Sequence, residues 1–133
     1  MCASKEYLET HGRPKKPEDL REHCLIGFPQ DTYAPFEEPN WLFDLAQVDI
    51  ESHYNLLMMN SMYAIHKAVK TGAGIAVLPD YLIKARHDLD MVLPDIERPA
   101  VDMYFVYAEE RRHSKRITAL REFLLQSFDN QDF

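Results

Sequence analysis

The 133-residue sequence has few cysteines and glycines and no long hydrophobic segment. It contains only Cys2 and Cys24, without a CxxC pair, which argues against a disulfide-stabilised secreted domain and favours a cytoplasmic location. No run of about 18 apolar residues occurs, so no membrane-spanning helix is predicted. The N-terminal residues also lack the apolar core of a signal peptide. With four glycines and no low-complexity stretch, we expect a folded chain of one domain's size.

Positive charge is also scarce. The chain has 15 lysines and arginines against 22 aspartates and glutamates, for a net charge of -7. Because nucleic acids and anionic membranes bind basic surfaces, this balance argues that the chain itself binds neither. The proportions of hydrophobic residues (46%) and charged residues (28%) are ordinary for a globular protein and argue against an intrinsically disordered chain.

The order of apolar residues, capping residues and helix breakers predicts alternating helices and strands. The predicted helices cover residues 5–9, 18–22, 62–71, 80–86 and 114–128. The predicted strands cover residues 24–28, 41–45, 48–51, 54–59, 74–78, 91–93 and 101–108, the second and third of these as a hairpin or two edge strands. Residues 101–108 are apolar on both faces, which is typical of a central, covered strand. The alternation predicts an α/β fold with a substantially parallel sheet.

No pattern in the sequence calls for a catalytic residue, a metal or a cofactor. The glycines of GAGIAV, residues 72–77, follow a helix and precede a strand, the reverse of the order in a dinucleotide-binding loop. Cys24 lies in an apolar run, as an unreactive core thiol would. No HxxxH pair occurs among the histidines, which we interpret as surface or turn residues: His11, His23, His53, His66, His87 and His113. Capping explains the serines that begin helices: Ser4, Ser61 and Ser114.

Two features allow a functional interpretation. Asn60 and Ser61 open a helix directly after a strand, and the free N–H groups of a helix start favour a small anion, a carboxylate above all. Simple helix capping is the alternative. Residues 111–116 (RRHSKR) place positive charge at a helix start, where it opposes the helix dipole. A solvated face and a contact with an acidic partner surface are the main alternatives for this segment, and contact with a nucleic acid is a minor one.

Several ordered segments resemble the effector-binding domain of LysR-type transcriptional regulators. The resemblance begins with ASKEYL (residues 3–8), GRP (12–14), PEDL (17–20) and HCLI (23–26). It continues through WLF (41–43), Asn60, AVKTGAGIAVLP (68–79) and VLP (92–94). It ends with Tyr107, Arg112, SKR (114–116) and FL (123–124), so that it spans essentially the whole chain.

The resemblance implies a fold like that of the type 2 periplasmic binding proteins, with two α/β subdomains and a small effector in the cleft between them. Residues 1–99 would form the second regulatory subdomain, and residues 100–133 the returning crossover strand and last helix of an incomplete first subdomain. The winged helix-turn-helix domain through which such regulators bind DNA has no counterpart in the sequence. The resemblance further implies a homodimer or a higher homo-oligomer, which agrees with the apolar stripe of the last predicted helix.

The resemblance also implies a set of effector-binding residues. The family pocket is lined by the loop after the first strand of the second subdomain, by the start of its main helix and by residues near the hinge. The matching positions in this sequence are Phe28, Pro29, Gln30, Asn60, Ser61, Met62, Gly74 and Ile75. The effector would be a small, anionic metabolite such as an organic acid.

The sequence is compatible with three classes of function. The leading hypothesis is a non-enzymatic sensor domain of a bacterial transcriptional regulator. A free-standing solute-binding or enzyme domain could have the same α/β layers, although no convergent catalytic site is visible. A pure interaction module that works only by pairing is the third possibility. Saturable stabilisation by one metabolite would favour the sensor, and tight dimerisation without it would favour the interaction module.

Overall fold

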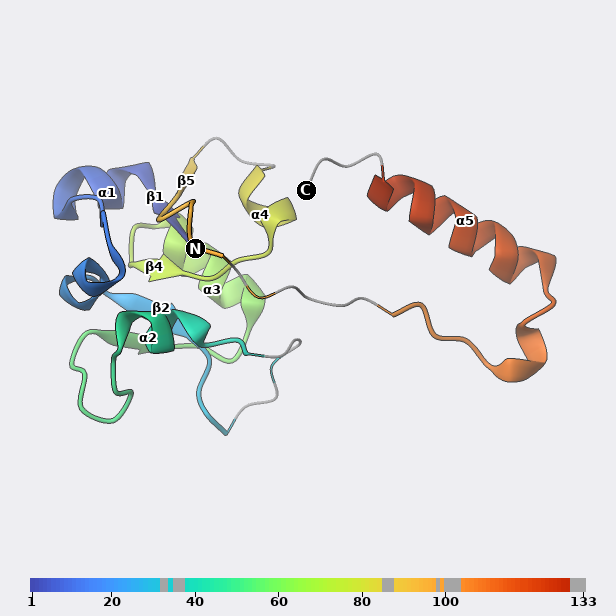
Figure 1. Cartoon of the computed structure of the whole chain (residues 1–133), viewed down its shortest axis with the longest axis horizontal. Helices are drawn as coiled ribbons and strands as arrows, with labels where there is room; N and C mark the ends of the chain where they lie inside the picture. Colours follow the sequence, from blue (N-terminus) through green and yellow to red (C-terminus); the bar gives the residue numbers. More distant parts are fainter. Residues whose placement is uncertain (32–33, 35–37, 85–87, 98, 100–103, 130–133) are drawn as a thin grey trace. The chain divides into compact units, whose positions relative to one another are not determined.

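The computed structural model describes residues 1–31, 34, 38–84, 88–97, 99 and 104–129. The chain forms two compact units, unit 1 (Met1–Pro99) and unit 2 (Ala100–Phe133) (Figure 1). Unit 1 contains a five-stranded sheet, whereas the described part of unit 2 is helical or irregular. The assignment of these parts to two subdomains stays a prediction.

The sheet of unit 1 is mixed, with the strand order β3-β2-β4-β1-β5. Its strands are β1 (Cys2–Ser4), β2 (Leu25–Gly27), β3 (Leu56–Met58), β4 (Ile75–Ala76) and β5 (Leu89–Met91). Strand β2 pairs in parallel with β3 and β4, as the alternation of helices and strands predicted, but β1 runs antiparallel to β4 and β5. Strand β1 was not predicted, because three residues before a capped helix are too few to show a period.

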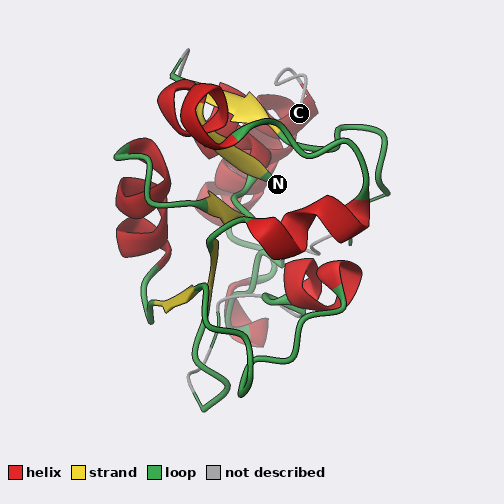
Figure 2. Cartoon of the chain, turned by 90° about the vertical axis from the view of Figure 1, so that its left-hand side faces the viewer, coloured by secondary structure: helices red, strands yellow, loops and turns green. Residues whose placement is uncertain are grey.

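Helices cover both faces of this sheet (Figure 2). They are α1 (Lys5–His11), the 3-10 helix η1 (Pro17–Glu22), α2 (Trp41–Ala46), α3 (Met62–Lys70) and α4 (Asp80–Lys84). Neighbouring strand residues belong to different cores: Leu25 packs in one hydrophobic cluster and Ile26 in the other. Because successive strand side chains point to opposite faces, this alternation shows that β2 is buried on both sides. The prediction of a buried strand at this position is confirmed.

The predicted ends of two helices are confirmed. The Ser4 hydroxyl accepts a hydrogen bond from the Tyr7 N–H at 3.2 Å and caps α1. Gly72 follows α3 with φ at 77°, in the left-handed region that suits glycine at a helix end. Gly74 is needed for a different reason, because a Cβ there would lie 2.3 Å from the carbonyl oxygen of Cys24. The glycines of residues 72–77 thus end a helix and allow close packing.

The prediction of a hairpin over residues 41–45 and 48–51 is wrong. Residues Trp41–Ala46 form helix α2, which buries Leu42, Phe43 and Ala46 to 2% exposure or less. These positions lie on one face of a helix, and this spacing was mistaken for strand alternation. Residues 48–51 form a turn, in which the Asp49 carboxylate accepts a hydrogen bond from the Glu51 N–H at 3.1 Å.

Unit 2 contains the short 3-10 helix η2 (Glu109–Arg111) and the long helix α5 (Lys115–Asp129), which confirms the predicted last helix. The predicted strand over residues 101–108 is wrong in its described part. Residues 101–103 lie outside the described residues, and residues 104–108 are irregular and exposed. A strand needs neighbours for its backbone N–H and C=O groups, and the described part of unit 2 offers it none.

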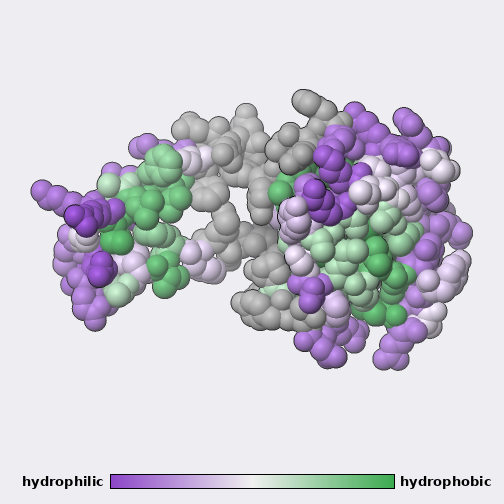
Figure 3. Space-filling model, turned by 180° about the vertical axis from the view of Figure 1, so that it is seen from behind, coloured by the Kyte–Doolittle hydropathy of each residue, from purple (hydrophilic) through white to green (hydrophobic). Residues whose placement is uncertain are grey.

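Large apolar side chains are exposed throughout unit 2. Tyr104 is 80% exposed, Val106 84% and Phe123 63%. Figure 3 shows hydrophobic residues gathered on the face of this unit that is turned to the viewer. Apolar side chains exposed in this way are typical of surfaces that take part in interactions. No helix in the described part of the chain is long and apolar enough to cross a membrane.

Candidate functional site

Two predicted site segments meet at one edge of the sheet. Strands β2 and β3 are parallel and in register, with Gly27 opposite Met58. The Met59 N–H donates to the Gly27 carbonyl at 2.9 Å, so the chain segments that leave the two strands start side by side. Phe28–Gln30 follow β2, and Asn60–Met62 follow β3. In sheets of this kind, ligands bind outside the carboxyl ends of the parallel strands, which is where these six residues lie.

The other two predicted residues lie elsewhere. Gly74 and Ile75 are at the amino end of β4, and Ile75 pairs with Leu25, the first residue of β2. The Ile75 N–H donates to the Cys24 carbonyl at 2.8 Å, and both Gly74 and Ile75 are buried. The structure therefore places this pair at the opposite edge of the sheet from the other six. Their close packing against Cys24 explains their presence without a ligand.

The six residues at the carboxyl edge divide into an apolar base and an exposed rim. Phe28 is only 3% exposed and packs in the core with Ile65. Pro29, Ser61 and Met62 are half-buried, whereas Gln30 and Asn60 are exposed. Of these six residues, Gln30, Asn60 and Ser61 carry the polar side chains that a small molecule could reach.

Helix α3 starts at this edge without a side-chain cap. Ser61 is its N-cap residue, with extended backbone angles, but its hydroxyl makes no capping hydrogen bond. The prediction that capping explains Ser61 is therefore wrong, in contrast to Ser4. No acidic residue lies in the first turn of α3. Among the described residues, no side-chain cap and no acidic residue of the first turn therefore occupies the positive end of the helix dipole, which favours a negatively charged group.

Asn40, which was not predicted as a site residue, holds the start of the loop after β2. Its amide oxygen accepts a hydrogen bond from the Phe28 N–H at 2.9 Å, and its amide nitrogen donates to the Phe28 carbonyl at 2.8 Å. Asn40 directly precedes α2 and is its N-cap residue. From sequence alone, an asparagine before a helix would be interpreted as a cap, so no local signal reveals this long-range contact.

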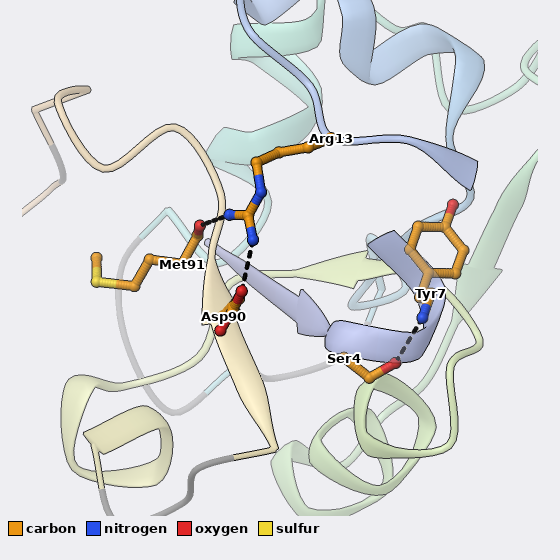
Figure 4. Close-up of polar contacts among 5 residues, drawn as sticks. All are labelled: Ser4, Tyr7, Arg13, Asp90 and Met91. Carbon is orange, nitrogen blue, oxygen red and sulfur yellow. Dashed lines mark hydrogen bonds and ion pairs between the residues drawn. The ribbon is translucent and has the colours of Figure 1, made fainter. Parts of the chain in front are cut away.

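A shallow pocket lies in another part of unit 1. It is lined by Lys5, Leu8, Glu9, Arg13 and Asp90, none of which was predicted as a site residue. Arg13 pairs with the Asp90 carboxylate and donates to the Met91 carbonyl at 2.9 Å (Figure 4). Because these charged groups bind one another, we interpret the contact as a structural link between the turn after α1 and β5.

Two histidines are buried, which corrects their interpretation as surface or turn residues. His23 is 5% exposed and His66 is 7% exposed. His23 Nδ1 lies 3.2 Å from the Tyr7 hydroxyl, which also accepts a hydrogen bond from the Cys24 N–H at 3.0 Å. Burial lowers the pKa of His23, and the nearby His11 adds to this effect. The contact ties α1 to the start of β2.

The thiols of the chain are poorly suited to nucleophilic chemistry. Burial raises the pKa of the Cys2 thiol to about 11 and also raises the pKa of Cys24. Since the thiolate is the reactive form, both groups are held in their inert state at neutral pH. Among the described residues, no group of three or more histidine, cysteine or acidic side chains could hold a metal ion.

The chain is similar to several curated regulators over part of their length. It is 32% identical over 110 residues to the uncharacterized HTH-type transcriptional regulator YcaN of Escherichia coli, a match that covers 79% of this chain and 35% of that protein. The probable HTH-type transcriptional regulator LtrA of Klebsiella pneumoniae is 27% identical, over 96% of this chain and 42% of that protein. The chain thus spans about two fifths of the length of the curated relatives it matches.

Solved structures agree with the fold. The CrgA regulatory domain, from a LysR-type transcriptional regulator of Neisseria meningitidis, superposes with a TM-score of 0.64 at 24% identity, over 94% of this chain and 62% of that chain. This likeness confirms the predicted α/β fold of the periplasmic-binding-protein type 2 kind. The family model described as LysR substrate binding domain matches residues 1–129. A match over nearly the whole chain shows that the protein belongs to the LysR substrate binding domain family.

Proposed function

We propose that the chain is the effector-sensing part of a LysR-type transcriptional regulator and binds a small, anionic metabolite at the carboxyl edge of its sheet. The observation that carries this proposal is the uncapped start of α3 beside the end of β2. There the free N–H groups of the helix and the amides of Gln30 and Asn60 suit a carboxylate. Its family is one of transcriptional regulators, which supports a sensor rather than an enzyme.

The sensing mechanism would be a shift between two arrangements of the regulator. An effector that binds one arrangement more tightly biases the equilibrium by its difference in affinity. DNA binding would belong to a helix-turn-helix domain outside this chain, since relatives named as HTH-type regulators are more than twice its length. The net charge of -7 supports the placement of DNA binding outside this chain, because DNA binds basic surfaces.

Unit 2 would belong to the first subdomain of the effector domain and take part in pairing two chains. Support comes from the exposed Tyr104, Val106 and Phe123 and from the partial match, 62%, to the solved CrgA regulatory domain. The same apolar surface also favours the second candidate function, an interaction module that works by pairing alone. Analytical ultracentrifugation of wild type and Phe123→Asp tests pairing; we expect the wild type to be a dimer and the variant to dissociate.

The binding proposal is tested by NMR titration of the ¹⁵N-labelled chain. Sodium succinate serves as the anionic probe, with sodium chloride keeping the ionic strength constant. We expect saturable shifts of the amide signals of Gln30, Ser61 and Met62. Tyr63 is 69% exposed in the first turn of α3, so Tyr63→Glu should place a competing carboxylate there and weaken succinate binding about tenfold.

The matched control is Tyr54→Glu. Tyr54 is 91% exposed and precedes β3, at the other end of the strand from the proposed site. It adds the same charge without facing the start of α3, so succinate affinity should stay at the wild-type value. An absence of saturable shifts, or shifts confined to the pocket around Lys5 and Arg13, would contradict the proposed site.

A further inference from the structure

The amide of Asn40 is used in an unusual way for a residue that begins a helix. Asparagine at an N-cap position commonly accepts a hydrogen bond from its own helix. Here α2 receives no side-chain cap, and both polar atoms of the amide bond the main chain of Phe28, twelve residues earlier. Helix α2 therefore has no side-chain cap, and the residue after β2 has two hydrogen bonds to the Asn40 amide.

Gly27 makes room for this contact. A Cβ at Gly27 would lie 2.6 Å from the Asn40 amide oxygen and 2.5 Å from the Phe43 ring. The side chains of Asn40 and Phe43 thus fill the space beside the last residue of β2. Because Phe43 is 2% exposed, its ring is a fixed boundary of this space.

The contact fixes where the chain leaves the sheet. The Gly27 carbonyl is bonded to the Met59 N–H, whereas both main-chain polar groups of the next residue, Phe28, are bonded to Asn40. If Pro29 and Gln30 were not held in place, they would lose conformational entropy whenever a ligand ordered them. The side chain that already orders the start of this loop removes part of that penalty.

We propose that Asn40 is a positioning residue, whose amide fixes the Phe28 peptide so that Pro29 and Gln30 are presented at the carboxyl edge of the sheet. That this edge is the effector site rests on the proposed function. Asn40 itself does not contact the effector. It acts through the main chain of Phe28 and sets the affinity by keeping Pro29 and Gln30 in their binding conformation before the effector arrives.

Hydrogen exchange of single amides in the full chain tests this role. Phe28 is compared with Leu25, whose N–H donates to the Asn55 carbonyl at 3.0 Å rather than to Asn40. In Asn40→Ala, the Phe28 amide should exchange about tenfold faster relative to the Leu25 amide, as expected from the loss of one hydrogen bond. In Asn40→Asp the oxygen that accepts from Phe28 remains, but a second carboxylate oxygen replaces the donor and repels the Phe28 carbonyl, so protection of this amide should lie between the values of Asn40→Ala and the wild type.

Succinate titration completes the test, with Ser4→Ala as the control. That variant removes the cap of α1 and lowers stability without touching the loop. We expect Asn40→Ala to weaken succinate binding about fivefold, and Ser4→Ala to leave it unchanged. Equal acceleration of the Phe28 and Leu25 amides in Asn40→Ala would overturn the positioning role, and so would unchanged succinate affinity. If the wild type binds no succinate while protection at Phe28 is lost selectively, the proposed function fails and the loop-positioning role of Asn40 stands.

Discussion

The two units of the chain use their apolar residues differently. In unit 1, strands and helices bury Leu25, Ile26 and Phe43 to 2% exposure or less. In unit 2, helix α5 has apolar residues at helical spacing, yet Leu120, Phe123 and Leu125 are 46%, 63% and 49% exposed. An amphipathic helix forms a core only when a second layer covers its apolar face. Unit 1 contains that second layer, and the described part of unit 2 does not.

The comparison predicts very different costs for removing a phenylalanine ring. Phe43→Ala should lower the free energy of unfolding of unit 1 by about 3–5 kcal/mol, because the ring is fully buried and leaves a cavity. Phe123→Ala should leave it unchanged within about 0.5 kcal/mol, because the ring is exposed. Urea unfolding followed by the fluorescence of Trp41, the single tryptophan, measures both. Similar losses in the two variants would contradict the exposed position of the Phe123 ring.

Two glycine substitutions test how closely the backbone of unit 1 is packed. Gly74→Ala should lower stability by about 3 kcal/mol, since its Cβ would meet the backbone of Cys24. Gly12→Ala should cost about 1–2 kcal/mol, because no atom lies within 4 Å and only the backbone conformation, with φ at 86°, is unfavourable. The difference between the urea midpoints of the two variants gives the result. If Gly12→Ala were the more damaging change, strain rather than packing would govern these sites.

The buried His23 should give the stability of unit 1 a pH dependence. Burial holds the pKa of His23 below its ordinary value of 6.5, helped by His11 and opposed by Asp19 and Glu22. The unfolded chain therefore binds the proton first as the pH falls. The contribution of His23 is full above about pH 6.5 and is lost as the pH falls through the folded pKa.

His23→Gln should accordingly flatten the loss of stability on acidification. The measurement is the urea midpoint at a series of values between about pH 7 and pH 5. Tyr7→Phe serves as a companion variant, since it removes the hydroxyl next to His23 and keeps the ring. A His23→Gln chain with the same slope as the wild type would show that other groups govern this pH range.

The smallest expected effects concern two ion pairs, one in each unit. Asp90→Asn breaks the contact with Arg13, whose side chains are 33% and 50% exposed, and should cost about 0.5 kcal/mol at low salt. Glu109→Gln breaks the contact with Arg112, whose side chains are 77% and 57% exposed, and should have no measurable effect. The melting temperatures of the two variants and the wild type, measured at low and at high salt, give the contribution of each ion pair. If Glu109→Gln lowered stability as much as Asp90→Asn, the Glu109–Arg112 ion pair would be stronger than its solvent exposure predicts.

Local chemistry made several elements predictable. Ser4 begins α1, Gly72 follows α3, and the apolar run after His23 forms a buried strand, each because neighbours in sequence decide the conformation. Residues 41–45 were mistaken for a strand, since a short apolar segment fits both periods. The burial of Leu42 and Phe43 against the sheet selected the helix.

Part of the candidate site could likewise be predicted from local sequence, and part could not. The segments after β2 and after β3 could be found from the sequence, because strand ends and helix starts leave local signals. The separation of Gly74 and Ile75 from the other six residues could not, since it depends on the register of β4 against β2. Asn40 was invisible for a similar reason, as its partner is twelve residues away and its local pattern is that of a helix cap.

The sequence by itself determined the alternation of helices and strands, the positions of most helix ends and the resemblance to the effector domains of LysR-type regulators. These properties depend on the side chains of residues close together in the chain. Only the tertiary structure decided that α3 starts without a cap, that Asn40 holds Phe28 and that His23 is buried. Each of these depends on which distant atoms fill the surrounding space, and that is fixed only when the layers pack.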